Sequence, residues 1–228
     1  MRFLSQMVFF IFARLRVSGT GRVPVAGGVL LVSNHQSMLD PVLVTLALPR
    51  ECHYMARDTL FANRWFRALI ESLNAFPVKR DTADLGAIRE ILRRLRDGGL
   101  VVTFPEGTRT ADGSIGPLRP GSMLVAQRAR CTVVPAVIDG AFEAWPRTAR
   151  LPHPRPIRVL YGAPIPPDQV AARSPEALAS QVHESMVALQ RRLRRSTRRP
   201  GRARNRSAAT RGLADRAPAA RMPPVQRH

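Results

Sequence analysis

A histidine and an aspartate lie five residues apart in the segment VSNHQSMLDP, residues 32–41, directly after an apolar run. On a continuous helix their side chains would point about 140° apart. His35 and Asp40 can therefore meet only if His35 lies in a turn and Asp40 lies in the first turn of the helix that follows. The carboxylate would then accept a hydrogen bond from one ring nitrogen and leave the other nitrogen free as a general base. The alternative is an aspartate that only caps a helix beside a loop histidine.

The nucleophile for such a base has to be found elsewhere, because no G-x-S-x-G sequence occurs in the chain. Ser33 and Ser37 are too close to His35 in sequence for the strand-to-helix turn that presents a catalytic serine. The simpler hypothesis is that His35 deprotonates a hydroxyl of the substrate. The absence of a serine turn also disfavours a Ser-His-Asp esterase. No cysteine and no second histidine lies near His35, so we expect no metal site.

A second group of polar residues follows the apolar strand sequence in VVTFPEGTRT, residues 101–110. Ligands of open α/β sheets bind at the carboxyl ends of the strands, where Glu106, Gly107, Thr108 and Arg109 are expected. Gly107 allows a close approach of the backbone, and Arg109 can hold phosphate oxygens with two parallel N–H groups. The alternative is a surface turn with an ion pair between Glu106 and Arg109.

Alternating strands and helices are predicted to position these residues. Short apolar runs bounded by Gly, Pro or polar residues predict buried strands at 27–34, 74–78, 100–104, 132–139 and 156–162. Helical spacing of apolar residues predicts helices at 38–48, 60–73, 82–99 and 121–130, and a final helix marked by Leu178, Val182, Met186, Leu189 and Leu193. In the third of these helices, Thr82 is expected to cap the start. This order predicts an α/β sheet covered by helices on both faces.

The two ends of the chain differ from the middle. The 228 residues carry a formal charge of +20 with 45% hydrophobic residues, which is enough for one cored domain, predicted at 17–195. Residues 1–16 predict an interfacial or a core helix, since the uncharged stretch is shorter than the roughly 20 residues of a membrane span. Residues 196–228 predict a disordered Arg-rich tail.

The basic tail indicates which partners the chain attracts. Residues 191–228 contain thirteen Arg and one Asp. Such a segment favours an anionic membrane surface, and nucleic acid would attract it equally well. Residues 191–228 contain no Phe, Tyr or Trp to stack on bases, so a nucleic-acid partner is not expected. The alternative is a solvated extension without a partner. Cys52 and Cys131 are expected to be reduced and buried, as in a cytoplasmic protein.

Four sequence blocks together resemble one family. The chain has N34-H35-x4-D40, then NAFPVKR at 74–80, FPEGTR at 104–109 and VVPAVIDG at 133–140. This order and spacing resemble the glycerolipid acyltransferase family, typified by 1-acyl-sn-glycerol-3-phosphate acyltransferases, over roughly residues 20–165. Asn74 stands where the family's second block usually begins with glycine. Asn tolerates left-handed backbone angles, so the same turn is expected.

The resemblance implies a fold, a reaction and a set of site residues. The fold is a mixed, mostly parallel sheet flanked by helices. The reaction is O-acyl transfer from acyl-CoA or acyl-ACP, as co-substrate and without a cofactor, to the hydroxyl of a lysophospholipid such as 1-acyl-sn-glycerol-3-phosphate, giving phosphatidic acid. His35 would be the base and Asp40 its partner, with Arg80 and Arg109 on the phosphate. Glu106 and Thr108 would contact the glycerol.

Two further expectations follow from the resemblance. Backbone N–H groups near the start of the helix after His35 are expected to bind the oxyanion. The protein is expected to be cytoplasmic and peripheral on the inner face of the cell membrane, where it meets its lipid acceptor. The alternatives are an enzyme of the same fold that acts on another lyso-lipid, and a non-catalytic lipid-binding or RNA-binding protein.

Overall fold

The structure is a computed structural model that describes residues 15–72, 74–78 and 85–197. Arg80, Thr82, residues 1–14 and residues 198–228 lie outside this part. The predictions of a first helix, of a helix cap at Thr82, of a phosphate contact by Arg80 and of a disordered tail therefore stay predictions.

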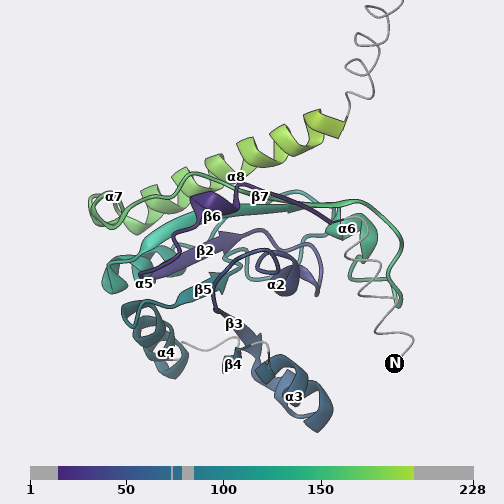
Figure 1. The fold of residues 1–228 in the computed structure, drawn as a ribbon, viewed down its shortest axis with the longest axis horizontal. Helices are drawn as coiled ribbons and strands as arrows, with labels where there is room; N and C mark the ends of the chain where they lie inside the picture. Colours follow the sequence, from purple (N-terminus) through teal and green to yellow (C-terminus); the bar gives the residue numbers. More distant parts are fainter. Residues whose placement is uncertain (1–14, 73, 79–84, 198–228) are drawn as a thin grey trace, which may run out of the picture. The chain divides into compact units, whose positions relative to one another are not determined.

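A seven-stranded sheet forms the centre of the described residues (Figure 1). Its strands are β1 (Leu15–Ser18), β2 (Val29–Ser33), β3 (Cys52–Arg57), β4 (Ala75–Val78), β5 (Leu100–Thr103), β6 (Thr132–Asp139) and β7 (Ile157–Tyr161). They are ordered β1-β7-β6-β2-β5-β3-β4. All neighbours pair in parallel except β6 and β7. The predicted mixed, mostly parallel sheet is thereby confirmed.

Helices connect the strands. They are α2 (Asp40–Leu43), α3 (Arg64–Ser72), α4 (Leu85–Arg96), α5 (Gly121–Ala129), α6 (Ala141–Ala144), α7 (Pro167–Ala171) and α8 (Pro175–Thr197), with short 3-10 turns η1 (Thr20–Arg22) and η2 (Asp58–Phe61). None of these helices is both long enough and apolar enough to cross a membrane.

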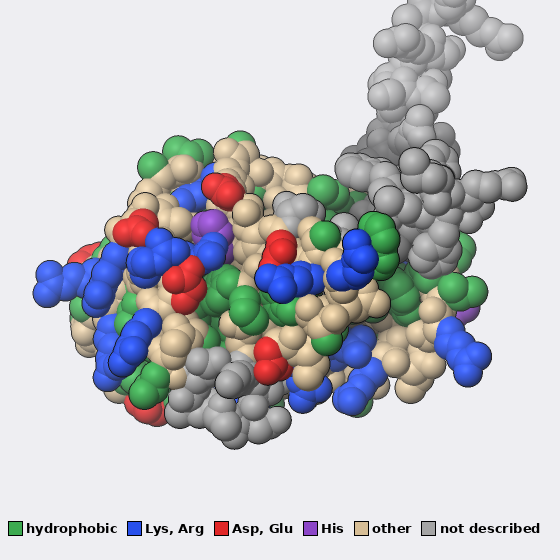
Figure 2. Space-filling view, turned by 90° about the horizontal axis from the view of Figure 1, so that it is seen from below, with side chains coloured by type: hydrophobic (Ala, Val, Ile, Leu, Met, Phe, Trp, Pro, Cys, Tyr) green, Lys and Arg blue, Asp and Glu red, His purple; other side chains and the backbone are tan. Residues whose placement is uncertain are grey.

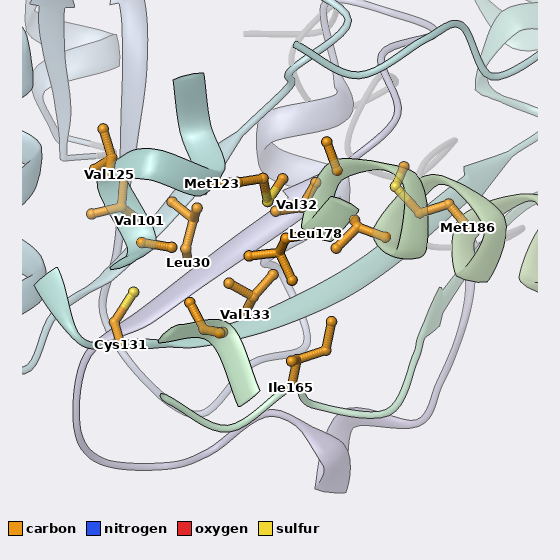
Figure 3. Packing of buried hydrophobic residues seen from close by; sticks show 14 of the residues in the cluster. Leu30, Val32, Val101, Met123, Val125, Cys131, Val133, Ile165, Leu178 and Met186 are labelled. Atoms are coloured by element: carbon orange, nitrogen blue, oxygen red, sulfur yellow. The ribbon is translucent and has the colours of Figure 1, made fainter. Parts of the chain in front are cut away.

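Two apolar cores cover the two faces of the sheet. In β2, Leu30 and Val32 pack into one core with α4, α5, α7 and α8, while Val29 and Leu31 pack into the other with α2 and α6. This alternation follows from the two-residue period of a strand. Figure 3 shows Met123 of α5 and Leu178 and Met186 of α8 meeting the side chains of β2 and β6 in the first core. Both faces of the central strands are buried, which explains their continuous apolar runs.

Charged side chains lie mostly outside these cores. On the face that Figure 2 shows, Lys and Arg side chains lie among Asp and Glu side chains and around a group of hydrophobic ones. On α4, Arg93 contacts Glu90 at 2.7 Å and Asp97 at 3.0 Å. Such exposed pairs add little to stability, because water and salt screen them. The stability of the fold therefore depends mainly on the two apolar cores.

Several predicted elements differ from the structure. Leu15 and Arg16 belong to β1 rather than to a first helix, because they pair with Ile157 and Arg158 of β7. The helix predicted at 38–48 is regular only from Asp40 to Leu43, and the Thr45 hydroxyl donates to the Pro41 carbonyl just beyond it. Strand β3 was not predicted. The final helix continues to Thr197, two residues past the predicted domain end.

Two local predictions are confirmed. Asn74 has φ of 59°, the left-handed conformation that the turn before β4 was expected to need. Cys52 and Cys131 are free and buried. Burial raises the pKa of each thiol to about 11, so both are protonated and unreactive near neutral pH.

Replacing Met123 by Ala should lower the free energy of unfolding by about 2–5 kcal/mol, because truncation of a buried side chain leaves a cavity. Met123 is 0% exposed. Leu124, the next residue of α5, is 39% exposed, and Leu124→Ala is the matched control. It should cost about 1 kcal/mol at most. Urea unfolding followed by circular dichroism measures both, and equal losses would contradict the packing described here.

Candidate active site

The two groups of polar residues meet at one edge of the sheet. His35 follows the end of β2, and the turn 104–109 follows the end of β5. These strands are adjacent and parallel, with Val32 opposite Thr103. Their carboxyl ends therefore lie side by side, and the structure brings His35 and Asp40 next to Glu106 and its neighbours, as the sequence predicted.

His35 and Asp40 are in direct contact. The Nδ1 atom of His35 lies 2.8 Å from Oδ2 of Asp40. The same oxygen accepts the backbone N–H groups of Gln36 at 2.5 Å and Ser37 at 2.7 Å. Asp40 begins α2, and Pro41 occupies the first turn of this helix, where its missing N–H is harmless. The predicted geometry, with the histidine in a turn and the aspartate at a helix start, is confirmed.

The Asp40 carboxyl group is fully buried. Burial raises its pKa above the ordinary value, and the contact with His35 and the two backbone N–H groups oppose this rise. Its second oxygen, Oδ1, has no hydrogen-bond partner among the described residues. A carboxylate in this position can stabilise the imidazolium that forms when the ring takes a proton during a reaction.

The other side of the histidine ring is open. Its side chain is 14% exposed, and Nε2 makes no hydrogen bond within the described part of the chain. The ring stacks on Phe104, with the centroids 4.5 Å apart and the planes inclined by 24°. Asp40 and Phe104 thus fix the orientation of the ring and leave Nε2 available for proton transfer. Sequence reasoning assigned no role to Phe104.

Glu106 supports the backbone of His35. Its Oε1 accepts the N–H of His35 at 2.8 Å, and its Oε2 accepts the N–H of Gly116 at 3.1 Å. The N–H of Thr110 donates to the carbonyl of His35 at 2.8 Å. Burial raises the pKa of Glu106, and these backbone donors oppose the rise. A contact of Glu106 with substrate stays a prediction, whereas its contact with the histidine turn is observed.

Two buried amides on either side of His35 connect the turn to β6 and α6. Asn34 donates to the carbonyl of Ile138 at 2.9 Å and accepts its N–H at 2.8 Å. Gln36 accepts the N–H groups of Ala141 and Phe142, each at 3.2 Å. The sequence signal for both was available, because polar residues next to a buried strand must find partners. Their partners are more than 100 residues away, which sequence reasoning missed.

The rest of the second turn faces outward. Gly107 has φ of 77°, Thr108 is exposed and Arg109 is half-buried. Arg109 makes no hydrogen bond or ion pair within the described residues, and Glu106 is engaged by backbone groups. The ion pair of the alternative interpretation is therefore not formed. The contacts of Thr108 and Arg109 with substrate stay predictions.

The predicted oxyanion donors are largely engaged inside the protein. The N–H groups of Gln36 and Ser37 donate to Asp40, that of Leu39 to the Ser37 hydroxyl, and that of Asp40 to the Ser37 carbonyl. The binding of an oxyanion by backbone donors stays a prediction, and these four N–H groups are not free in the structure. They are used to form the turn that holds the carboxylate of Asp40.

The neighbouring serines are also placed. Ser33 and Ser37 are buried, and the hydroxyl of Ser33 donates to the Asn34 carbonyl. Within the described part of the chain, no serine hydroxyl contacts the ring of His35. Among the same residues, no three His, Cys, Asp or Glu side chains come together in a way that could hold a metal ion.

The fold and the site together define a class of protein. Residues 14–139, more than half of the chain, match the acyltransferase family. The chain belongs to this family, and the resemblance that the four sequence blocks indicated is confirmed.

Individual relatives point the same way. The chain is 31% identical over 127 residues to a 1-acyl-sn-glycerol-3-phosphate acyltransferase of Bacillus subtilis, covering 55% of this chain and 63% of that protein. It is 29% identical over 142 residues to one of Cocos nucifera, covering 61% of this chain and 46% of that protein. The matched part thus spans less than two thirds of the length of these relatives.

A solved structure shows the same fold. The crystal structure of the 1-acyl-sn-glycerophosphate acyltransferase PlsC from Thermotoga maritima superposes with a TM-score of 0.70 at 23% identity, covering 85% of this chain and 77% of that one. The predicted fold class, an α/β fold like that of the glycerolipid acyltransferases, is confirmed.

Replacing Asp40 by Asn tests the electrostatics of the buried carboxyl group. Its folded-state pKa is raised above 3.8, so its contribution to stability is present below that pH and is lost as the pH rises through the folded pKa. As the pH rises from 3.8 through the folded-state pKa, the free energy of unfolding of the wild type should fall relative to that of Asp40→Asn. Urea unfolding at several pH values measures the difference. If the free energy of unfolding of the wild type instead rose relative to that of the variant with increasing pH, the raised pKa of Asp40 would be contradicted.

Proposed function

We propose that this protein transfers an acyl group from acyl-CoA or acyl carrier protein to the free hydroxyl of a lysophospholipid. The proposed acceptor is 1-acyl-sn-glycerol-3-phosphate, and the product is phosphatidic acid. The observation that carries the proposal is the histidine base, in a chain of the acyltransferase family. Nδ1 of His35 is bound to the buried carboxyl group of Asp40, and Nε2 makes no hydrogen bond within the described residues. The curated relatives, named 1-acyl-sn-glycerol-3-phosphate acyltransferases, support the choice of acceptor.

The proposed reaction needs no acyl-enzyme. Nε2 of His35 takes the proton of the acceptor hydroxyl as its oxygen attacks the thioester carbonyl, and the imidazolium forms beside the carboxylate of Asp40. When the tetrahedral intermediate collapses, the C–S bond breaks and the sulfur leaves as a thiol with the proton from His35. The histidine is then neutral again.

Positioning of the acceptor is assigned to the arginines. Arg109, from the turn after β5, would hold the phosphate so that the hydroxyl reaches His35, and Arg80 is proposed to contribute from outside the described residues. Thr108, exposed in the same turn, is proposed to contact the glycerol. Catalysis in this scheme comes largely from fixing the two reactants relative to one base.

The acceptor is a lipid, so we propose that the protein works at the inner surface of the cell membrane. The Arg-rich segment supports this proposal by its charge, because basic residues near an anionic bilayer contribute about 1 kcal/mol each. Nucleic acid is not proposed as a partner.

Replacing His35 by Ala should lower kcat at least about 100-fold, because general-base catalysis contributes about 10²–10⁴. Purified full-length protein is assayed with labelled thioesters against a set of lyso-lipids. His153, which is exposed and distant in sequence from both turns, provides the control variant His153→Ala, expected to keep normal turnover. Turnover by a folded His35→Ala protein would refute the assignment. Labelling of the wild type by a fluorophosphonate would indicate a serine esterase instead.

Replacing Arg109 by Ala should raise KM for the phosphate-bearing acceptor about tenfold or more, since a charge-assisted hydrogen bond is lost. Steady-state kinetics with lysophosphatidate and with monoacylglycerol, which has no phosphate, separate this effect from a general loss of activity. KM for monoacylglycerol should not change. Equal KM values of variant and wild type for lysophosphatidate would remove Arg109 from the phosphate site.

A further inference from the structure

Arg119 lies against the glycine of the turn after β5. A Cβ atom built on Gly107 would lie 2.9 Å from Cζ of Arg119, and 3.1 Å from each of Nε and Nη2. Three guanidinium atoms at nearly equal distance place the flat face of the group over Gly107. The space that a side chain at 107 would need is occupied by Arg119. Glycine is therefore favoured at 107 for two reasons: it tolerates the φ of 77°, and it leaves room for this guanidinium group.

The backbone holds Arg119 in this place. Its N–H donates to the carbonyl of Pro105 at 3.0 Å, so residue 119 is fastened to the same turn. The loop between them is anchored at Gly113, whose carbonyl accepts Gln36 at 3.2 Å and Gln190 at 3.0 Å. Pro120 then leads directly into α5. The position of Arg119 over the turn thus follows from the main-chain path as well as from its side chain.

Arg119 has no anionic partner in the described part of the chain. Its side chain is exposed and makes no hydrogen bond or ion pair there. Glu106, the acid of the same turn, accepts the N–H groups of His35 and Gly116 instead. Arg109, two residues beyond Gly107, is likewise without an ion pair in this part. By contrast, Arg93 and Arg94 on α4 both contact Glu90.

Arg109 and Arg119 thus bring two positive charges, without counter-ions among the described residues, to the same turn, and such charges attract an anion. Phosphate matches this arrangement, because guanidinium N–H groups pair with phosphate oxygens through parallel hydrogen bonds. The turn also carries Glu106, which holds His35. An anion bound by these arginines would therefore lie at the turn that contacts the backbone of His35.

We propose that Arg119 binds a phosphate group of a substrate together with Arg109, as a second cation of the site that lies beyond the four sequence blocks. This inference rests on the proposed function for the identity of the substrate. The phosphate belongs to one of two sources, the lysophospholipid acceptor or the coenzyme A of the donor, and kinetics distinguishes them.

The test is Arg119→Ala in the full-length protein, with Arg119→Lys beside it. Arg128, an exposed arginine at the other end of α5, provides the control Arg128→Ala, which removes the same charge. Arg119→Ala should raise KM for one of the two substrates about tenfold with little change in kcat. Arg119→Lys should recover part of this loss, since it keeps the positive charge but lacks the paired N–H groups of the guanidinium. A higher KM for lysophosphatidate would show that Arg119 binds the phosphate of the acceptor. A higher KM for acyl-CoA alone would show that it binds a phosphate of the donor. Unchanged KM values for both substrates would overturn the proposal.

A binding measurement keeps the proposal separate from the enzymatic activity. Binding of sn-glycerol 3-phosphate and of coenzyme A to the folded wild type and to both alanine variants is followed by NMR or calorimetry. Arg119→Ala should weaken one of the two at least about tenfold, and Arg128→Ala should weaken neither. This result would support the phosphate site even if no acyl transfer were found. Equal binding by wild type and Arg119→Ala would refute it even in an active enzyme.

Discussion

The site depends on one buried oxygen, Oδ2 of Asp40, and on the three groups that converge on it. Ring nitrogen Nδ1 of His35 and the N–H groups of Gln36 and Ser37 all contact this atom. Burying a carboxylate costs free energy unless it is hydrogen-bonded, so residues 35–40 form a tight turn around it. This turn fixes the position of the His35 ring. The same contacts that make burial of the charge tolerable therefore aim the second nitrogen of His35 outward.

A tight turn alone would still move relative to the sheet, and three polar side chains, two of them buried, prevent this. Asn34 pairs with the backbone of Ile138, Gln36 with the start of α6, and Glu106 with the N–H of His35 itself. Each of these bonds replaces one that the backbone would otherwise make with water, and leaving any of them unmade would cost about 1–3 kcal/mol. The polar residues beside His35 are thus as necessary to the position of the base as its carboxylate partner.

The sequence predicted what depends on neighbours along the chain. The apolar run of β2, the contact of His35 with Asp40 and the left-handed Asn74 all follow from local periodicity, helix geometry and side-chain preference. Strand β3 was missed because only Cys52 and Tyr54 of its six residues are buried and His53 and Arg57 interrupt it, so no apolar run marks it. The bond from Glu106 to the backbone of His35 spans 71 residues, and nothing in the sequence tells that the carboxylate faces inward. Hydrogen-bond partners that are distant in the sequence can be predicted only once the order of the strands in the sheet is known.

The turn after β5 shows how one short segment can relate a base to a charged part of its substrate. Glu106 points to the backbone of His35, Gly107 admits the guanidinium of Arg119, and Arg109 carries a cation without a partner in the described residues. Only a few peptide units separate these functions, and peptide units are stiff. The backbone of the turn therefore fixes where the side chains of Glu106 and Arg109 begin, next to the turn that carries His35. In the proposed reaction, an acceptor held by its phosphate at this turn would present its hydroxyl to His35, as direct transfer without an acyl-enzyme requires.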